Sequence, residues 1–283
     1  ACGLSRRTPT VSWPGVNTFL SRFDAMADKA AAQVIAQYST SFSLAVRTLP
    51  NPERTHIRNL YAVVRIADEI VDGTTAQANE CPETALDLYE EQVLHAPAHR
   101  FHTDPVLHAW ARTFRECRLN EDHVRAFFAS MRADLTQTTF TKQELDTYIY
   151  GSAEVIGLMC LDVFLRGRDT PHRSELEDGA RALGSAFQKV NFLRDLGEDS
   201  RALGRAYFNA KLDDDLKSTL TSQITDELDR AHTAIPLLPP AARGGVAAAE
   251  ALFRELNARI AATPATELQT TRVRVPNHLK VAL

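Results

Sequence analysis

Apolar residues recur along most of the chain at spacings of three and four, the period that gives an α-helix one buried face and one polar face. Strict alternation of apolar and polar positions, which would predict a β-strand, is confined to a weak candidate at residues 272–275. The helical period predicts elements at about residues 24–37, 52–72, 83–95, 104–118, 121–137, 142–166, 173–199, 219–234 and 239–262. We therefore expect an all-α, single-domain helical bundle that spans residues 1–283.

Helix boundaries and composition support this interpretation. Pro52 and Glu53 fall in a first turn, Gly73 follows a last turn, and Pro105 stands near a helix start after Asp104. The chain has only 12 glycines and 13 prolines in 283 residues, so helix breakers are scarce. Hydrophobic residues make up 44% and charged residues 24%, which is typical of a globular protein and argues against disorder.

Charge and cysteine usage exclude several classes of protein. The 32 Lys and Arg residues against 36 Asp and Glu residues give a net charge of −4, without the basic excess of a nucleic-acid-binding protein. The four cysteines contain no CxxC pair and are too few for a disulfide framework in a chain of this length. We therefore expect reduced thiols, a cytoplasmic location and no nucleic-acid partner.

No segment predicts a targeting signal or a membrane span. Residues 1–13 lack the apolar run of a signal peptide. The most apolar stretch, residues 145–165, is interrupted by three acidic residues, so a buried helix is predicted there. Peripheral membrane contact stays open, because three basic residues near the C-terminus could meet a lipid surface. They are Arg272, Arg274 and Lys280.

Two predicted helices carry acidic stripes, and the first lies in the helix at 52–72. At 100° per residue, one face of this helix carries Ile57, Tyr61, Val64, Asp68 and Asp72. Two carboxylates one turn apart on a partly apolar face repel each other and lose solvation, so a positive partner is expected. That partner is either a basic side chain such as Arg65 in a surface groove or a bound cation.

The second stripe lies in the helix at 173–199. One face carries Gly184, Gln188, Asn191, Asp195 and Asp199. The amide oxygens precede the carboxylates by whole turns, which makes a row of oxygen ligands beside an apolar flank. Glu69 and Glu198 add one further carboxylate next to each stripe.

Oxygen ligands without His or Cys suit a hard cation, and Mg²⁺ is the usual choice when a phosphate shares the coordination. The four aspartates of the two stripes carry four negative charges, and a bound diphosphate would add more. Divalent cations must then bridge the two anions. Basic residues near the stripes that could bind diphosphate oxygens directly are Arg47, Arg65, Arg194, Arg205 and Lys211.

The stripes belong to a longer ordered series of motifs. The series comprises Tyr38–Ser39–Thr40–Ser41–Phe42; Tyr61, Arg65, Asp68, Glu69 and Asp72; Tyr148, Gly151 and Gly157; Gln188, Asn191, Arg194, Asp195 and Asp199; and Arg205, Tyr207 and Phe208. Together these motifs resemble the squalene/phytoene synthase family, and most closely its bacterial phytoene synthases. The resemblance runs from about residue 35 to the C-terminus, whereas residues 1–30 form an N-terminal segment without an assigned role.

The resemblance implies an all-α isoprenoid synthase fold with a central cavity, and an Mg²⁺-dependent prenyltransferase that holds two or three ions. It implies metal binding by Asp68, Asp72, Asn191, Asp195 and Asp199. It implies substrate binding by Tyr38, Ser39, Thr40, Ser41, Phe42, Tyr61, Arg65, Gln188, Arg194, Arg205, Tyr207 and Arg272. It places Tyr148, Ser152, Gly157, Ala180 and Gly184 at cavity-lining positions. Two departures are Glu69, where many members have Asp, and Phe253, where some have Tyr.

The implied reaction is the head-to-head condensation of two geranylgeranyl diphosphates to phytoene, through a cyclopropyl diphosphate, in carotenoid biosynthesis. The four aspartates, Tyr61 and Tyr148 are the expected catalytic residues; either tyrosine, or the departing diphosphate, could take the last proton. NADPH is not expected. Aromatic side chains and the small residues Gly151, Ser152, Ala153, Gly157 and Gly184 could line the cavity, or could simply allow ordinary core packing.

Three other functions share part of this sequence pattern. Dehydrosqualene or squalene synthesis from two farnesyl diphosphates is the main alternative, because cavity depth sets the chain length. A non-catalytic helical paralogue would have lost its acidic motifs, whereas all four aspartates stand here. Head-to-tail prenyltransferases and terpene cyclases usually carry DDxxD with a different second motif.

Overall fold

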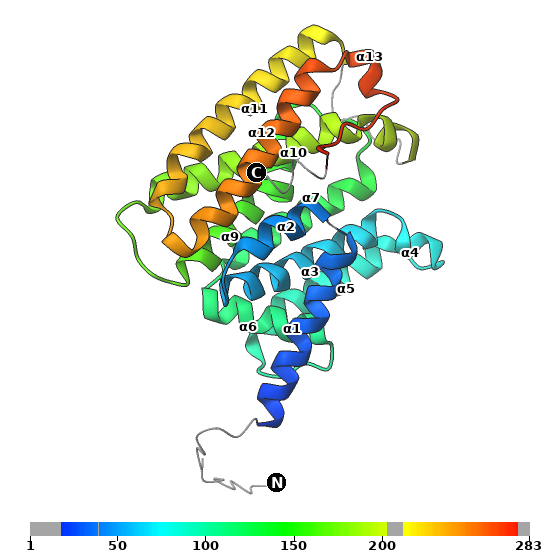
Figure 1. The fold of residues 1–283 in the computed structure, drawn as a ribbon. Coiled ribbons are helices and arrows are strands. Elements are labelled where there is room, and N and C mark those ends of the chain that lie inside the picture. Colours follow the sequence, from blue (N-terminus) through cyan, green and yellow to red (C-terminus); the bar gives the residue numbers. More distant parts are fainter. Residues whose placement is uncertain (1–17, 39, 203–211, 277–283) are drawn as a thin grey trace, which may run out of the picture.

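The computed structural model describes residues 18–38, 40–202 and 212–276, without the side chains of residues 40, 41, 44 and 197–202. Within these residues the chain is helical and contains no strand (Figure 1). The α-helices are α1 (Phe19–Tyr38), α2 (Thr40–Thr48), α3 (Glu53–Val71), α4 (Thr74–Gln77), α5 (Pro82–His95), α6 (Pro105–Cys117), α7 (Glu121–Thr136), α8 (Lys142–Ile149), α9 (Val155–Leu165), α10 (Arg173–Ala202), α11 (Asp214–Ala234), α12 (Pro240–Ala262) and α13 (Ala265–Leu268). The shorter elements are the 3₁₀ turns η1 (Ala96–Ala98) and η3 (Ile235–Leu237) and the π-helical turn η2 (Tyr150–Glu154).

The all-α prediction is confirmed, and the nine predicted helices all exist with ends shifted by a few residues. The weak strand candidate at 272–275 is wrong, because these residues adopt no regular structure. Sequence periodicity missed α2, α4 and α13, which are too short to show a helical repeat. The helix predicted at 142–166 is divided into α8 and α9 by η2, where the hydrogen bonding loosens to the π pattern.

Helices α10, α11 and α12 pack together in the upper part of Figure 1, and α1, α3, α5 and α6 pack in the lower part. Helix α9 lies between the two groups and contacts both α3 and α10. The stretch Lys142–Leu165 is long and apolar enough by composition to cross a membrane, but 67% of its most apolar window is buried inside the protein. Its hydrophobicity is therefore largely accounted for by its position in the core.

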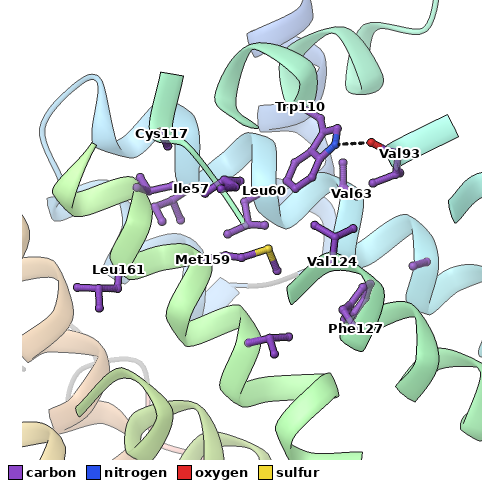
Figure 2. Close-up of a cluster of buried hydrophobic side chains, with 14 of the residues drawn as sticks. Ile57, Leu60, Val63, Val93, Trp110, Cys117, Val124, Phe127, Met159 and Leu161 are labelled. Atoms are coloured by element: carbon purple, nitrogen blue, oxygen red, sulfur yellow. Dashed lines mark hydrogen bonds between the residues drawn. The ribbon is translucent and has the colours of Figure 1, made fainter. Parts of the chain in front are cut away.

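The larger hydrophobic core joins α3, α6, α7 and α9, as Figure 2 shows for a set of its buried side chains. Trp110 is 1% exposed, and its indole N–H donates to the backbone oxygen of Val93 at 2.9 Å. Burial of a large aromatic ring with its one polar atom satisfied stabilises the fold without a desolvation penalty. A second core forms between α10, α11, α12 and residues 273–275.

A buried polar network fixes α3 against α1 and α6. The Asn59 amide donates to Asp28 Oδ1 at 3.1 Å and to Thr113 Oγ1 at 3.1 Å. Asp28 in turn forms an ion pair with Arg112. Unpaired buried polar groups cost free energy, so this network favours one orientation of α3 against α1 and α6. The orientation of α3 in turn determines where its acidic C-terminal end lies.

Glycines allow the central helices to approach closely. A Cβ added at Gly157 on α9 would lie 2.3 Å from the backbone oxygen of Ala180 on α10. One added at Gly184 on α10 would lie 2.5 Å from the backbone oxygen of Ala153, and one at Gly151 would lie 2.4 Å from that of Ala126. The space beside these glycines is filled by backbone. These contacts favour close helix packing at the three glycines. The assignment of Gly157 and Gly184 to cavity-lining positions stays a prediction.

Candidate active site

The first acidic motif lies at the C-terminal end of α3. The guanidinium of Arg65 pairs with Glu69 and lies 3.7 Å from Asp68 Oδ2. The ring of Tyr38, at the end of α1, lies 4.5 Å from the Arg65 guanidinium carbon, which is a cation–π contact. Asp72 is the C-cap residue of α3 and is exposed. The stripe predicted from sequence therefore ends at an exposed C-cap residue, with an arginine next to its first aspartate.

The aromatic residues predicted for this region are brought together in pairs. Phe42 on α2 stacks on Tyr61 of α3 with ring centroids 5.6 Å apart. Phe187 of α10 stacks on Phe253 of α12 with ring centroids 3.6 Å apart. The first pair lies one turn from Arg65 and presents π faces near the acidic motif.

Tyr148 connects three helices next to the first motif. Its hydroxyl donates to Asp134 Oδ2 on α7 at 3.0 Å. Its ring lies 6.1 Å from that of Phe192 on α10 and 5.1 Å from that of Phe140. The side chain is buried, and the residue is 5% exposed. Tyr148 thus forms a direct structural link between α7 and the helix that carries the second acidic motif.

Asp134 was missed by the sequence analysis, although the same arithmetic would have found it. Phe127, Met131 and Asp134 follow the i, i+4, i+7 progression, so a carboxylate stands on the buried face of α7. A lone acidic residue in an apolar stripe was the available signal.

The electrostatics connect Asp134 to Asp68. The protein shields Asp68 from water, which raises the pKa of its carboxyl to about 7; Arg65 opposes this rise, and the charges of Asp72, Asp134 and Glu69 add to it. Burial alone would also raise the pKa of Glu69, but hydrogen bonds from Thr74 and Arg65 outweigh it and lower that pKa. Asp68 is therefore the carboxylate of this motif whose ionised form most needs a positive partner.

The second acidic motif lies along α10. Arg194 Nε donates to Asp195 Oδ1 at 2.9 Å, and Arg272 Nε lies 2.8 Å from the same oxygen. Gln188 and Asn191 are half-buried on the preceding turns. Arg272 comes from the irregular segment that follows α13, so the C-terminal part of the chain folds back onto α10.

Several predicted site residues lie outside the described part of the structure. Ser39, Arg205 and Tyr207 are not described, nor are Lys211 and Phe208. Thr40, Ser41 and Asp199 lie in α2 and α10, and their side chains are not described. Their assignment to substrate or metal binding stays a prediction.

A series of interactions joins the two motifs. Asp68 and Asp134 interact electrostatically, and the hydroxyl of Tyr148 bonds Asp134. The ring of Tyr148 packs on Phe192, which follows Asn191 in the sequence.

Among the described side chains, no three His, Cys, Asp or Glu residues converge closely enough to hold a metal alone. Mg²⁺ commonly needs only one or two carboxylates together with waters and phosphate. Burial, together with the charges of Asp72, Asp134 and Glu69, raises the pKa of Asp68 and so disfavours its ionised form, which a divalent cation would stabilise.

Two hollows lie away from these motifs. One of about 540 Å³ is lined by Arg118, His123, Asp162 and Arg173 among others, and one of about 420 Å³ lies beside Ser185, Lys189 and Glu227. Neither is lined by Asp68 or Asp195. The central cavity implied by the family resemblance remains a prediction.

Comparison with known proteins points to one family. The family model described as squalene/phytoene synthase matches residues 35–278. A phytoene synthase of Arthrospira platensis is 36% identical over 186 residues, which is 62% of this chain and 58% of the relative. A 4,4'-diapophytoene synthase of Staphylococcus haemolyticus is 30% identical over 201 residues, 70% of this chain and 66% of the relative. The chain thus spans less than two thirds of the length of these two relatives.

Solved structures of related synthases share the fold of this chain. A dehydrosqualene synthase in complex with a ligand superposes with a TM-score of 0.76 at 22% identity, over 93% of this chain and 95% of that one. Likeness at this level of identity establishes the all-α isoprenoid synthase fold, and the substrate has to be argued separately.

Proposed function

The chain belongs to the squalene/phytoene synthase family of prenyltransferases, and from this premise we propose that it joins two molecules of geranylgeranyl diphosphate head to head to form phytoene. The observation that carries the proposal is the pair of acidic helix segments, each with an arginine at its aspartate, in a chain that is 36% identical to a phytoene synthase over 186 residues. Prenyl diphosphates are accordingly the proposed substrates, and carotenoid biosynthesis is the proposed context.

Asp68, Asp72, Asn191, Asp195 and Asp199 are the residues that would hold Mg²⁺. Mg²⁺, when bound, supplies Lewis-acid charge that stabilises a leaving diphosphate. The residues fit this role because Asp68 and Asp195 present carboxylate oxygens that pair with arginines within the described residues. Those arginines, Arg65, Arg194 and Arg272, are the groups we assign to the diphosphate oxygens, since guanidinium forks bind phosphate in pairs of hydrogen bonds.

The chemistry then requires no protein nucleophile. Ionisation of one allylic C–O bond leaves a carbocation, which the double bond of the second substrate attacks; loss of a proton closes the cyclopropane ring. Ionisation of the remaining diphosphate opens the ring, and loss of a second proton gives the hydrocarbon. Tyr61, Phe42 and Tyr148 present aromatic faces that stabilise positive charge. No reductant takes part, so NADPH is not a proposed cofactor.

Dehydrosqualene synthesis from two farnesyl diphosphates is the second candidate. It is favoured by the 30% identity to a 4,4'-diapophytoene synthase and by the structural likeness to a dehydrosqualene synthase. The two reactions share every polar residue of the site and differ in the length of hydrocarbon that must fit.

One assay tests both candidates. Purified protein is supplied with Mg²⁺ and either the C15 or the C20 diphosphate, with and without NADPH, and the hydrocarbon is identified by mass. We expect a C40 product from the C20 substrate that does not depend on NADPH. A C30 product formed only from the C15 substrate would establish the second candidate, and absence of any hydrocarbon from either substrate would overturn the proposal.

Peripheral membrane contact of a cytoplasmic protein is proposed because substrates and product carry long hydrocarbon chains. Of the basic C-terminal residues, Arg272 contacts Asp195, and Lys280 lies outside the described residues. Co-sedimentation with anionic phospholipid vesicles tests it, and protein that stays in the supernatant at low salt would contradict it.

A further inference from the structure

Asp134 interacts electrostatically with Asp68 of the first acidic motif, and through Tyr148 it is linked to α10, the helix that carries the second motif. It lies near the C-terminal end of α7, on the face that also carries the buried Phe127 and Met131. The basic residue two positions earlier, Arg132, is committed to Asp87 and Glu90 on α5. The side chain of Asp134 is half-buried and is bonded by the hydroxyl of Tyr148.

The ring of Tyr148 is held by its surroundings independently of this hydrogen bond. Phe140 and Phe192 pack against the ring. The backbone oxygen of Tyr148 accepts a hydrogen bond from Ser130 Oγ on α7 at 3.2 Å. Because ring and backbone are both fixed, the hydroxyl group is the part of Tyr148 whose orientation Asp134 controls.

The hydroxyl of Tyr148 is the donor of the 3.0 Å hydrogen bond, so its proton is directed at Asp134 Oδ2. Any further hydrogen bond at the Tyr148 oxygen is then one that the oxygen accepts. The oxygen consequently presents lone pairs, and not a proton, to any other neighbouring group. This polarity favours a neighbouring positive charge, such as a carbocation, over an anion.

We propose that Asp134 is a positioning residue: it holds the hydroxyl proton of Tyr148, so that the lone pairs of the Tyr148 oxygen face the carbocation during the reaction. The inference rests on the proposed function, in which Tyr148 faces reacting carbon atoms. It goes beyond that function because it assigns a role to a carboxylate outside both acidic motifs. The charge of Asp134 also acts on Asp68, so the same residue couples Tyr148 to the first motif.

Replacing Asp134 with asparagine tests the assignment, because the shape is kept while the group gains an N–H₂ donor. The amide can then donate to the Tyr148 oxygen, and the hydroxyl proton is free to turn toward the substrate. We expect Asp134→Asn to lower kcat by about 10–100-fold with KM changed by less than about threefold, as for loss of an interaction made in the transition state. Tyr148→Phe should have a similar effect.

The decisive readout is the double variant. If Asp134 acts through Tyr148, then Asp134→Asn combined with Tyr148→Phe should be no slower than the slower single variant. Asp122→Asn, an exposed aspartate in the first turn of the same helix, is the matched control and should keep wild-type kcat. Helical circular dichroism and Tm identify variants that fail to fold, and Asp134→Ser replaces Asp134→Asn if that variant is unfolded.

The outcomes separate this inference from the proposed function. Wild-type protein that forms no hydrocarbon from either diphosphate overturns both. Active wild-type protein in which the two single defects multiply overturns the positioning role alone, since Asp134 would then act by another route. A folded Asp134→Asn variant with unchanged kcat also overturns it.

Discussion

Arg272 and Asp195 meet at the second acidic motif, with Arg272 Nε 2.8 Å from Asp195 Oδ1, although they lie far apart in the chain. Arg194 Nε bonds the same oxygen at 2.9 Å. Two guanidinium groups therefore contact one carboxylate oxygen. Guanidinium groups bind phosphate oxygens in pairs of hydrogen bonds, so both arginines could turn to a diphosphate if Asp195 bound a cation instead.

Arg272→Gln should weaken substrate binding. Loss of one of the two guanidinium groups at Asp195 removes a partner for diphosphate oxygens, and we expect KM to rise about tenfold, equivalent to roughly 1.4 kcal/mol. Steady-state kinetics measure this. Arg274→Gln is the matched control, because Arg274 is exposed two positions away; equal KM values for the two variants would contradict the assignment.

Asp68→Asn and Asp195→Asn should each remove most turnover while the helical circular dichroism spectrum stays intact. Both changes keep side-chain shape and remove the negative charge that a divalent cation requires. A loss of about 10²–10⁴-fold in kcat is expected from removal of such electrostatic stabilisation. Full turnover in both variants would end the assignment of these aspartates to a metal site.

The stability of metal-free protein should fall as pH rises from about 4 to about 7. Asp68 has a pKa of about 7 in the folded protein and an ordinary value of 3.8, so the folded state binds more protons in this window and ionisation above it is unfavourable. Its side chain is 33% exposed, so solvent screening reduces the effect, to about 1–2 kcal/mol. Asp68→Asn should therefore raise Tm by about 2–8 °C at pH 8, and by much less at pH 4. A lower Tm for Asp68→Asn than for wild type at pH 8 would show that the ionised carboxylate is stabilised instead.

Chelation should stop the reaction reversibly. EDTA removes free divalent cations, and without them the negative charge on the aspartates and on the diphosphates is not neutralised. Hydrocarbon formation should cease and should return when Mg²⁺ is added in excess. Turnover that persists after EDTA treatment and gel filtration would argue that arginines alone stabilise the leaving group.

Gly157→Ala should destabilise the protein by about 1–3 kcal/mol, because the added methyl group would meet the backbone of α10 and force α9 away from it. Gly244→Ala on α12 is the control, since nothing lies within 4 Å of the added Cβ and helix propensity should give a gain of about 0.5–1 kcal/mol. Urea unfolding measures both. A neutral Gly157→Ala variant would mean that the two helices can separate at little cost.

The sequence predicted the helices and the acidic stripes because both depend on spacings of three and four residues within one segment. The stripe of Ile57, Val64 and Asp68 follows from 100° per residue, and no distant contact is needed to place it on one face. The short helices α2 and α13 carried no such repeat, and the π turn at Tyr150–Glu154 left no mark on the hydrophobic pattern.

Only the tertiary structure decided which segments meet. The Tyr148 hydroxyl finds Asp134, Arg272 reaches Asp195, and Gly157 packs on Ala180 because helices distant in the chain are pressed together by two hydrophobic cores. Local periodicity specifies the face of a helix, whereas its neighbour depends on how all the apolar faces are buried at once. The sequence therefore predicted which helix faces are acidic, whereas the residues that contact those faces were known only from the tertiary packing.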